Sequence, residues 1–142
     1  MSPINIYFAG AIRGGRNDAA TYQIIVRLLS GYGTVLTEHV GDEILLLEEK
    51  ALAESEIFTR DMQWLSMADL LVAEVSTPSL GVGYELAMAE NLNIPVLCLF
   101  RKKNKALSAM IAGNPFFQAV VYKNSSELKD AVEIFLSEHR LI

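Results

Sequence analysis

The chain has 142 residues, of which 51% are hydrophobic and 20% are charged, and its formal net charge is −5. This length and composition predict one domain, spanning 1–142, with a hydrophobic core, and they exclude a disordered segment. The negative charge argues against a nucleic-acid partner held by a basic face. No apolar run approaches the ~20 residues needed to cross a membrane, so we expect no membrane partner.

The N-terminus lacks the basic start and long apolar stretch of a signal peptide. The single cysteine, Cys98, lies in an apolar run and predicts a buried thiol in a reducing compartment. We therefore expect a cytoplasmic or nuclear protein.

In chain order, apolar runs alternate with helical patterns. The expected strands are Ile4–Ala9, Thr34–Thr37, Asp69–Val75, Ile94–Phe100 and Ala119–Tyr122. The expected helices are Ala19–Ser30, Glu43–Ala53, Glu56–Met67, Tyr84–Asn91 and Ser126–His139. This alternation predicts a Rossmann-like α/β fold, an open parallel sheet of about five strands with helices on both faces.

Ligands of such sheets bind at the carboxyl ends of the strands, which directs attention to the loops at Gly10–Asp18, Thr37–Asp42 and Ser76–Gly83. The first loop contains the segment Gly10–Arg16, in which glycines permit close backbone approach and the following helix start favours an anion. Arg13 and Arg16 add positive charge. The segment is consistent with phosphate binding or with an ordinary turn carrying exposed arginines. It matches neither a Walker loop nor the dinucleotide-binding glycine pattern.

The loop Ser76–Gly83 leads into a predicted helix that carries Glu85 in its first turn. Ser79 can donate to an anion, and Gly81 and Gly83 allow close approach of a ligand. Glu85 is either a functional carboxylate or a residue that only complements the helix dipole.

Three other polar residues are candidates for chemistry. Asp61 lies on a predicted helix, either as a functional acid or as a solvated side chain paired with Arg60. Glu74 lies inside an apolar run, where a buried carboxylate needs a partner. His39 follows the second strand and either lines a pocket or bonds the backbone. There is no Cys/His set for a metal and no Ser-His-Asp triad, so we expect no metal and no cofactor.

These segments together resemble the 2'-deoxynucleoside 5'-phosphate N-hydrolases of the nucleoside 2-deoxyribosyltransferase superfamily. The resemblance runs in order through nearly the whole chain. It is carried by Tyr7–Arg16, Val35–Val40, Asp61–Leu65, Val72–Val75, Pro78–Leu86, Leu97–Arg101 and Leu107–Ile111.

The resemblance implies a role for each matching residue. Glu85 is implied to be the nucleophile, Asp61 the acid that assists departure of the base, and Tyr7 a neighbour of the sugar. His39 is implied to lie near the base. The residues implied to bind substrate, mainly its 5'-phosphate, are Gly10, Ala11, Ile12, Arg13, Gly14, Gly15, Arg16, Ser79 and Gly81.

The resemblance also implies a homodimer in which Ser108, with Ala109 and Met110 beside it, reaches the phosphate in the neighbouring subunit. The family enzymes have a serine after Gly10, where this chain has Ala11, so one hydroxyl donor to the phosphate is missing.

By analogy with retaining glycosidases, we expect the two carboxyl groups to lie roughly 5 Å apart. Glu85 must be ionised, and the pKa of Asp61 must be raised for it to donate. The expected reaction is hydrolysis of the N-glycosidic bond of a 2'-deoxynucleoside 5'-monophosphate. The alternatives are a ribonucleotide N-glycosidase of the cytidine monophosphate type, a deoxyribosyltransferase, and a nucleotide-sensing module without catalysis.

Overall fold

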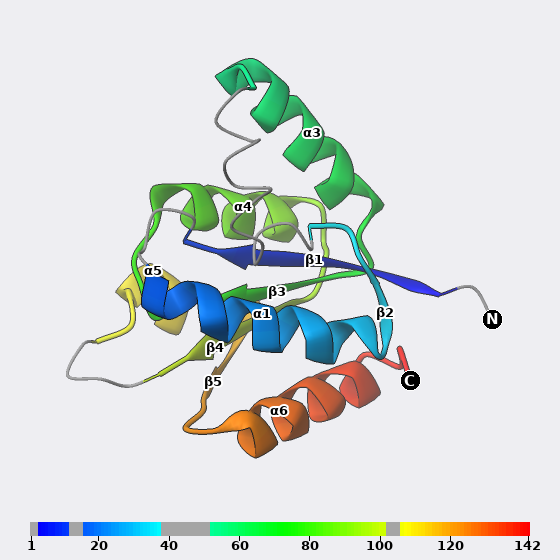
Figure 1. The fold of residues 1–142 in the computed structure, drawn as a ribbon, viewed down its shortest axis with the longest axis vertical. Coiled ribbons are helices and arrows are strands. Elements are labelled where there is room, and N and C mark those ends of the chain that lie inside the picture. The colour runs from blue at the N-terminus through cyan, green and yellow to red at the C-terminus, as the bar shows by residue number, and fades with distance from the viewer. Residues whose placement is uncertain (1–2, 12–15, 38–51, 102–105) are drawn as a thin grey trace.

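The computed structural model describes residues 3–11, 16–37, 52–101 and 106–142, and for Arg16 and Asn17 it describes the backbone alone. Within these ranges strands and helices alternate (Figure 1). The strands are β1 Ile4–Gly10, β2 Gly33–Val35, β3 Leu70–Glu74, β4 Val96–Phe100 and β5 Phe117–Val121. The helices are α1 Arg16–Ser30, α3 Glu54–Met67, α4 Leu80–Asn91, α5 Ala109–Ala112 and α6 Ser125–Glu138.

The five strands form one parallel sheet in the order β2-β1-β3-β4-β5, which confirms the predicted architecture. The strand order reverses between β1 and β3. The chain leaves β1 toward α1 on one face of the sheet and leaves β3 toward α4 on the other (Figure 1). The chain therefore leaves the carboxyl ends of these two adjacent strands in opposite directions. Ligands of such sheets bind at this position, which we call the β1/β3 crevice.

The sheet is buried on both faces because successive side chains point to opposite sides of each strand. Ile6 and Phe8 of β1 pack with α1 and α6, whereas Tyr7 and Ala9 pack with α3 and α4. Strands β3 and β4 repeat this alternation. The strand pattern therefore decides which polar side chains meet at each face of the carboxyl edge.

The helix α4 begins at Leu80, four residues before the predicted start at Tyr84. The hydroxyl of Ser79 accepts a hydrogen bond from the backbone N–H of Val82 at 3.2 Å, which caps the helix. The prediction of a loop through Gly83 and of Glu85 in the first turn was wrong. The cap overrides the low helix propensity of the two glycines, and Glu85 becomes the sixth residue of the helix.

The other predicted elements are present with every end within three residues of its predicted position, apart from the helix expected at Glu43–Ala53. That helix falls largely outside the described residues, and Leu52 and Ala53 are not helical. The short α5 was not predicted. Cys98 is fully buried in β4, as expected, and burial raises the pKa of its thiol to about 12.

Candidate active site

Tyr7 and Glu85 meet on the face of the sheet that α3 and α4 cover. Tyr7 is almost fully buried in β1, and its hydroxyl donates a hydrogen bond to Oε2 of Glu85. Burial raises the pKa of Tyr7 well above its usual value, and the charge of Glu85, its hydrogen bond and the charge of Asp61 raise it further. Arg60 opposes this shift. The phenol therefore stays protonated and presents an O–H to the carboxylate.

Asp61 lies on α3, close enough to Tyr7 to influence its titration. Its Oδ1 accepts from Nε and Nη2 of Arg60, both at 3.0 Å, which confirms the local pairing considered from the sequence. The guanidinium of Arg60 also lies over the ring of Trp64, 4.8 Å from its centroid. Arg60 thus contacts both the Asp61 carboxylate and the Trp64 ring. The structure thus brings Tyr7, Glu85 and Asp61 together at the β1/β3 crevice.

The position of Glu85 in the second turn of α4 weakens the explanation that it only complements the helix dipole. That effect falls off within the first turn of a helix. Instead Glu85 is partly buried and bonded to a tyrosine from a different element. Glu85 is therefore a carboxylate held against the central part of the sheet by Tyr7.

The predicted phosphate loop is described only at its ends. Ala11 is buried, and its backbone N–H donates to the hydroxyl of Tyr22 at 3.0 Å. Gly10 is required at its position, because a Cβ there would lie 2.8 Å from the ring of Tyr22. Arg16 starts the backbone of α1. Outside the described residues lie Ile12, Arg13, Gly14, Gly15 and His39.

Ser79 and Gly81 lie at the start of α4. The Ser79 hydroxyl uses its oxygen to cap the helix, so its hydrogen is available to another acceptor. A Cβ at Gly81 would meet only the Ser79 oxygen, at 3.8 Å. There is accordingly room for a ligand to approach the first turn, as the glycine pattern suggested.

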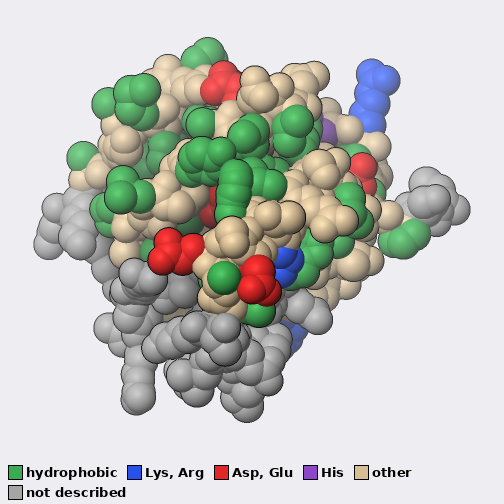
Figure 2. Space-filling model, turned by 90° about the horizontal axis from the view of Figure 1, so that it is seen from above, with side chains coloured by type: hydrophobic (Ala, Val, Ile, Leu, Met, Phe, Trp, Pro, Cys, Tyr) green, Lys and Arg blue, Asp and Glu red, His purple; other side chains and the backbone are tan. Residues whose placement is uncertain are grey.

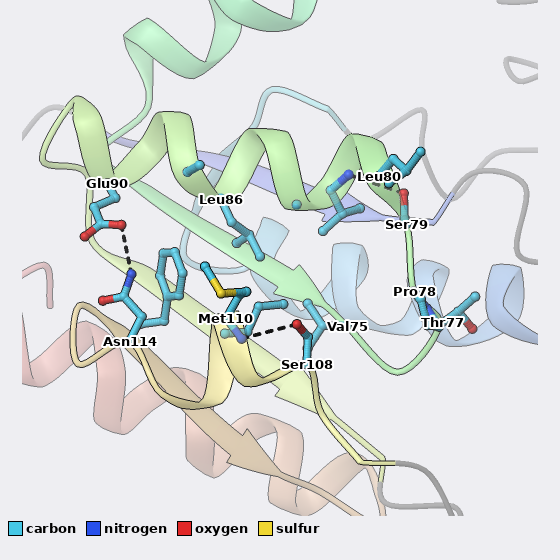
Figure 3. Close-up of a pocket in the computed structure, with 15 residues that line it drawn as sticks. Val75, Thr77, Pro78, Ser79, Leu80, Leu86, Glu90, Ser108, Met110 and Asn114 are labelled. Carbon is cyan, nitrogen blue, oxygen red and sulfur yellow. Dashed lines mark hydrogen bonds between the residues drawn. The ribbon is translucent and has the colours of Figure 1, made fainter.

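Ser108 lines a groove of about 510 Å³ between α4 and α5, on the wall opposite α4 (Figure 3). Its side chain caps α5 by accepting from the N–H of Met110 at 3.3 Å. Residues of α4 form the opposite wall, which includes Ser79 and Leu86. Glu85 points instead to Tyr7. The predicted residues Ser108 and Met110 therefore line the groove, Ala109 lies between them in the sequence, and none of the three contacts the pair formed by Tyr7 and Glu85.

Hydrophobic side chains are exposed around the groove and along α3 and α4. Leu80 is 97% exposed and Met110 is 81% exposed. Phe58 of α3 and Tyr84 of α4 form an exposed edge-to-face pair with ring centroids 6.0 Å apart. The view onto the side that carries α3 shows hydrophobic side chains gathered in the same way (Figure 2). Such a surface is typical of a contact with another molecule.

Glu74, the unusual carboxylate in an apolar run, is 1% exposed at the end of β3. Its oxygens accept from the N–H of Ser76 at 2.7 Å, from the Ser76 hydroxyl at 3.0 Å and from the Tyr122 hydroxyl. Nε of Arg101 lies 3.6 Å from Oε2. The expected need for partners is confirmed. The partners themselves were not predicted, because they follow three different strands and no local pattern joins them.

In the described ranges, no group of three or more His, Cys, Asp and Glu side chains is arranged to hold a metal ion. Likewise, no helix in those ranges is long and apolar enough to cross a membrane.

Comparison with protein families and relatives gives consistent results. A family model described as nucleoside 2-deoxyribosyltransferase matches residues 6–131. The 5-hydroxymethyl-dUMP N-hydrolase of Danio rerio is 50% identical over 141 residues, covering 96% of this chain and 95% of the relative. The Rattus norvegicus protein of the same name is 54% identical over 116 residues, covering 80% and 71% respectively.

Among solved structures, a CMP N-glycosidase of Clostridium botulinum has a TM-score of 0.62 to this chain. The match covers 93% of this chain and 99% of that one, at 14% sequence identity. At that identity the similarity shows a shared fold.

The phenol of Tyr122 provides a test of the buried carboxylate. Tyr122→Phe removes a donor to Glu74 and should lower the free energy of unfolding by about 1–3 kcal/mol at neutral pH. The pKa of Tyr122 is raised, by burial and then by Glu74. Above about pH 10 the unfolded chain therefore loses a proton that the folded chain keeps, and this part of the stability declines. Urea unfolding should show the difference between parent and variant narrowing as the pH rises above that value.

Tyr32→Phe is the matched control, since it also removes a phenol that donates to a carboxylate, Glu133, at 2.6 Å. The side chain of Glu133 is 43% exposed, so the loss at neutral pH should be smaller. Equal losses of unfolding free energy in Tyr122→Phe and Tyr32→Phe would contradict the buried pairing of Tyr122 with Glu74. A stability difference between the parent and Tyr122→Phe that stays constant with pH would contradict it as well.

Proposed function

Because the chain belongs to the nucleoside 2-deoxyribosyltransferase family, we propose that it hydrolyses the N-glycosidic bond of 2'-deoxynucleoside 5'-monophosphates. The products are the free base and 2-deoxyribose 5-phosphate. The observation that carries the proposal is the contact of Tyr7 with Glu85 at the β1/β3 crevice, with Asp61 beside it. The two relatives, named for hydrolysis of 5-hydroxymethyl-dUMP, support the substrate class. The family resemblance drawn from the sequence is thus confirmed.

In the first step, a carboxylate oxygen of Glu85 attacks C1' of the sugar and forms an ester bond. The bond from C1' to the base nitrogen breaks, and its electron pair leaves with the base. Asp61 supplies the proton that the departing base needs. We assign the uptake of this proton by Asp61 to the complex with the substrate.

In the second step, water attacks C1' of the ester and Asp61 takes a proton from the water. The C1'–O bond to Glu85 breaks, which releases 2-deoxyribose 5-phosphate and restores the carboxylate. Tyr7 keeps Glu85 oriented through its O–H and stays protonated throughout because of its raised pKa. The same donor stabilises the charge that returns to Glu85 when the ester breaks.

The 5'-phosphate supplies binding energy that positions the sugar. We assign it to the crevice between the loop after β1 and the start of α4, where Ser79 has a free donor hydrogen. Since Ala11 contributes only its backbone and a methyl group, the hydroxyl of Ser79 and the positive end of α4 support the anion there.

Replacement of the nucleophile is the direct test. Glu85→Gln should reduce release of free base from a deoxynucleoside monophosphate by on the order of a thousandfold or more, because an amide does not form the ester. Mass spectrometry of the rapidly quenched parent should show a covalent deoxyribose phosphate adduct, absent in the variant. Glu133→Gln, on α6 at the opposite face of the sheet, should keep parental activity. An active Glu85→Gln variant would remove the central assignment.

A panel of substrates separates the candidate activities. Release of base from deoxynucleoside monophosphates should exceed that from deoxynucleosides by about a hundredfold or more, since the phosphate supplies remote binding energy. The ribonucleotide with the same base should also react more slowly. Equal rates on nucleoside and nucleotide, with transfer to an added base, would identify a transferase. Preference for the ribonucleotide would identify a ribonucleotide N-glycosidase. If no base were released from any of these substrates, the result would identify a sensing module.

We further propose that the chain works as a homodimer in which Ser108 reaches the phosphate of the neighbouring site. Two observations support this arrangement. Ser108 lines the groove on the side of α4 away from Tyr7, and the strongly exposed Leu80 and Met110 border that groove. Burial of these side chains against a second copy would remove apolar surface from water.

Mixing an inactive variant with a weakened one tests the shared site. Ser108→Ala should raise KM roughly tenfold through loss of one hydrogen bond to phosphate. When it is unfolded and refolded together with Glu85→Gln, hybrid dimers gain one site that carries both native residues. Base release at low substrate should then exceed the average of the separate variants. A mixture that stays at this average would show that Ser108 serves its own chain or none.

A further inference from the structure

Helix α1 is bonded to both loops that border the crevice. Tyr22 accepts from the backbone N–H of Ala11, in the loop after β1, at 3.0 Å. One turn earlier, Asp18 accepts a hydrogen bond from the hydroxyl of Thr77, in the loop after β3. Residues four apart lie on the same face of a helix. The same helix is thus bonded to Ala11 and to Thr77, two residues between which the described part of the chain forms no backbone hydrogen bond.

Asp18 is only 7% exposed and is held by a cation. Nη2 of Arg101 lies 2.7 Å from Oδ1 of Asp18, and Nη1 donates to the Thr21 hydroxyl at 3.4 Å. The backbone N–H of Arg101 also donates to the Ser76 hydroxyl at 2.8 Å. Arg101 therefore connects the end of β4 to α1 and to the loop after β3.

Charge is the second consequence of this arrangement. Asp18 and Glu74 are two buried carboxylates near a crevice to which we assign a phosphate dianion. The Arg101 guanidinium, at 2.7 Å and 3.6 Å from them, offsets part of their negative charge. Partial burial lowers the pKa of Arg101, but Tyr122, Asp18 and Glu74 raise it, and it lies above its ordinary value in the balance. The guanidinium of Arg101 is thus charged at neutral pH.

The hydrogen bond from Thr77 to Asp18 also restricts the position of Ser79. Pro78 stands between Thr77 and Ser79, and its ring fixes one of its two backbone dihedrals. Ser76 is already bonded to Glu74 and Arg101, so the segment from 76 to 79 is held at its start by Ser76 and at its middle by Thr77. The position of the Ser79 hydroxyl and of the first turn of α4 follows from these two contacts.

We propose that Asp18 and Thr77 are positioning residues that hold the start of α4 at a fixed distance from Ala11 at the end of β1, with Arg101 supporting Asp18. They do not touch the substrate. They set the width of the crevice that receives the phosphate, and so they control affinity for the phosphate group and not the rate of bond cleavage. This inference rests on the phosphate site assigned under the proposed function.

The experiment compares two substitutions at one position. Thr77→Val keeps the shape of the side chain and removes the hydroxyl, whereas Thr77→Ser keeps the hydroxyl. Thr34→Val is the control, because Thr34 is an exposed threonine on β2 at the opposite end of the sheet. For each protein we would measure kcat and KM for a deoxynucleoside monophosphate, the melting temperature, and calorimetric binding of inorganic phosphate and 2-deoxyribose 5-phosphate.

Thr77→Val should raise KM roughly tenfold, the factor that corresponds to loss of one charge-assisted hydrogen bond, with kcat changed less than about twofold. Binding of both phosphate ligands should weaken by the same factor. Thr77→Ser and Thr34→Val should both keep the parental KM and the parental affinity for the two phosphate ligands. Asp18→Asn provides a second variant, in which the loss of the ion pair to Arg101 should also raise KM.

Unchanged phosphate affinity in folded Thr77→Val and Asp18→Asn would overturn the proposal, as would a fall in kcat with KM constant. The calorimetric measurement does not depend on turnover. If the parent released no base but bound the phosphate ligands, the proposed hydrolase function would fail, while the effect of Thr77→Val on affinity would still decide the positioning role. A parent protein that bound neither phosphate ligand would overturn the positioning role as well.

Discussion

The buried carboxylate of Glu74 organises the edge of the sheet at which the candidate site lies. A charge with 1% exposure at the end of the central strand needs donors around it. The hydrogen-bond donors are Ser76 and Tyr122, and the Arg101 guanidinium forms an ion pair with the carboxylate at 3.6 Å. These three residues follow three neighbouring strands. Satisfying one carboxylate therefore ties the ends of β3, β4 and β5 together, and with them the loop that leads into α4.

Strand alternation separates two kinds of polar chemistry at this edge. Gly10 and Glu74 face α1, so the ion pairs of Arg101 gather on that side. Tyr7 faces α3 and α4, where it meets Glu85. The carboxylate to which we assign the attack is thus kept apart from the charges that hold the loops. A shift of one residue in β1 would exchange the two sets.

The sheet was predictable because its signal is local and repeated. Continuous apolar runs such as Leu70–Ala73 indicate strands buried on both faces, and the helical patterns between them force parallel connections. The start of α4 was misplaced because Gly81 and Gly83 suggest a loop. Their propensity cost is outweighed by the cap at Ser79 and by packing of Val82 and Leu86 on the sheet.

The sequence by itself determined the α/β class, the family, the two loops at the crevice and the identity of Tyr7, Asp61 and Glu85 as candidates, because each depends on short patterns or on residue order. Only the tertiary structure decided which side chains meet. The contact of Tyr7 with Glu85 joins residues 78 positions apart, and that of Asp18 with Thr77 joins residues 59 apart. Such contacts depend on the order of the strands in the sheet and on the face of the sheet to which each side chain points. The local sequence around a residue determines neither of these.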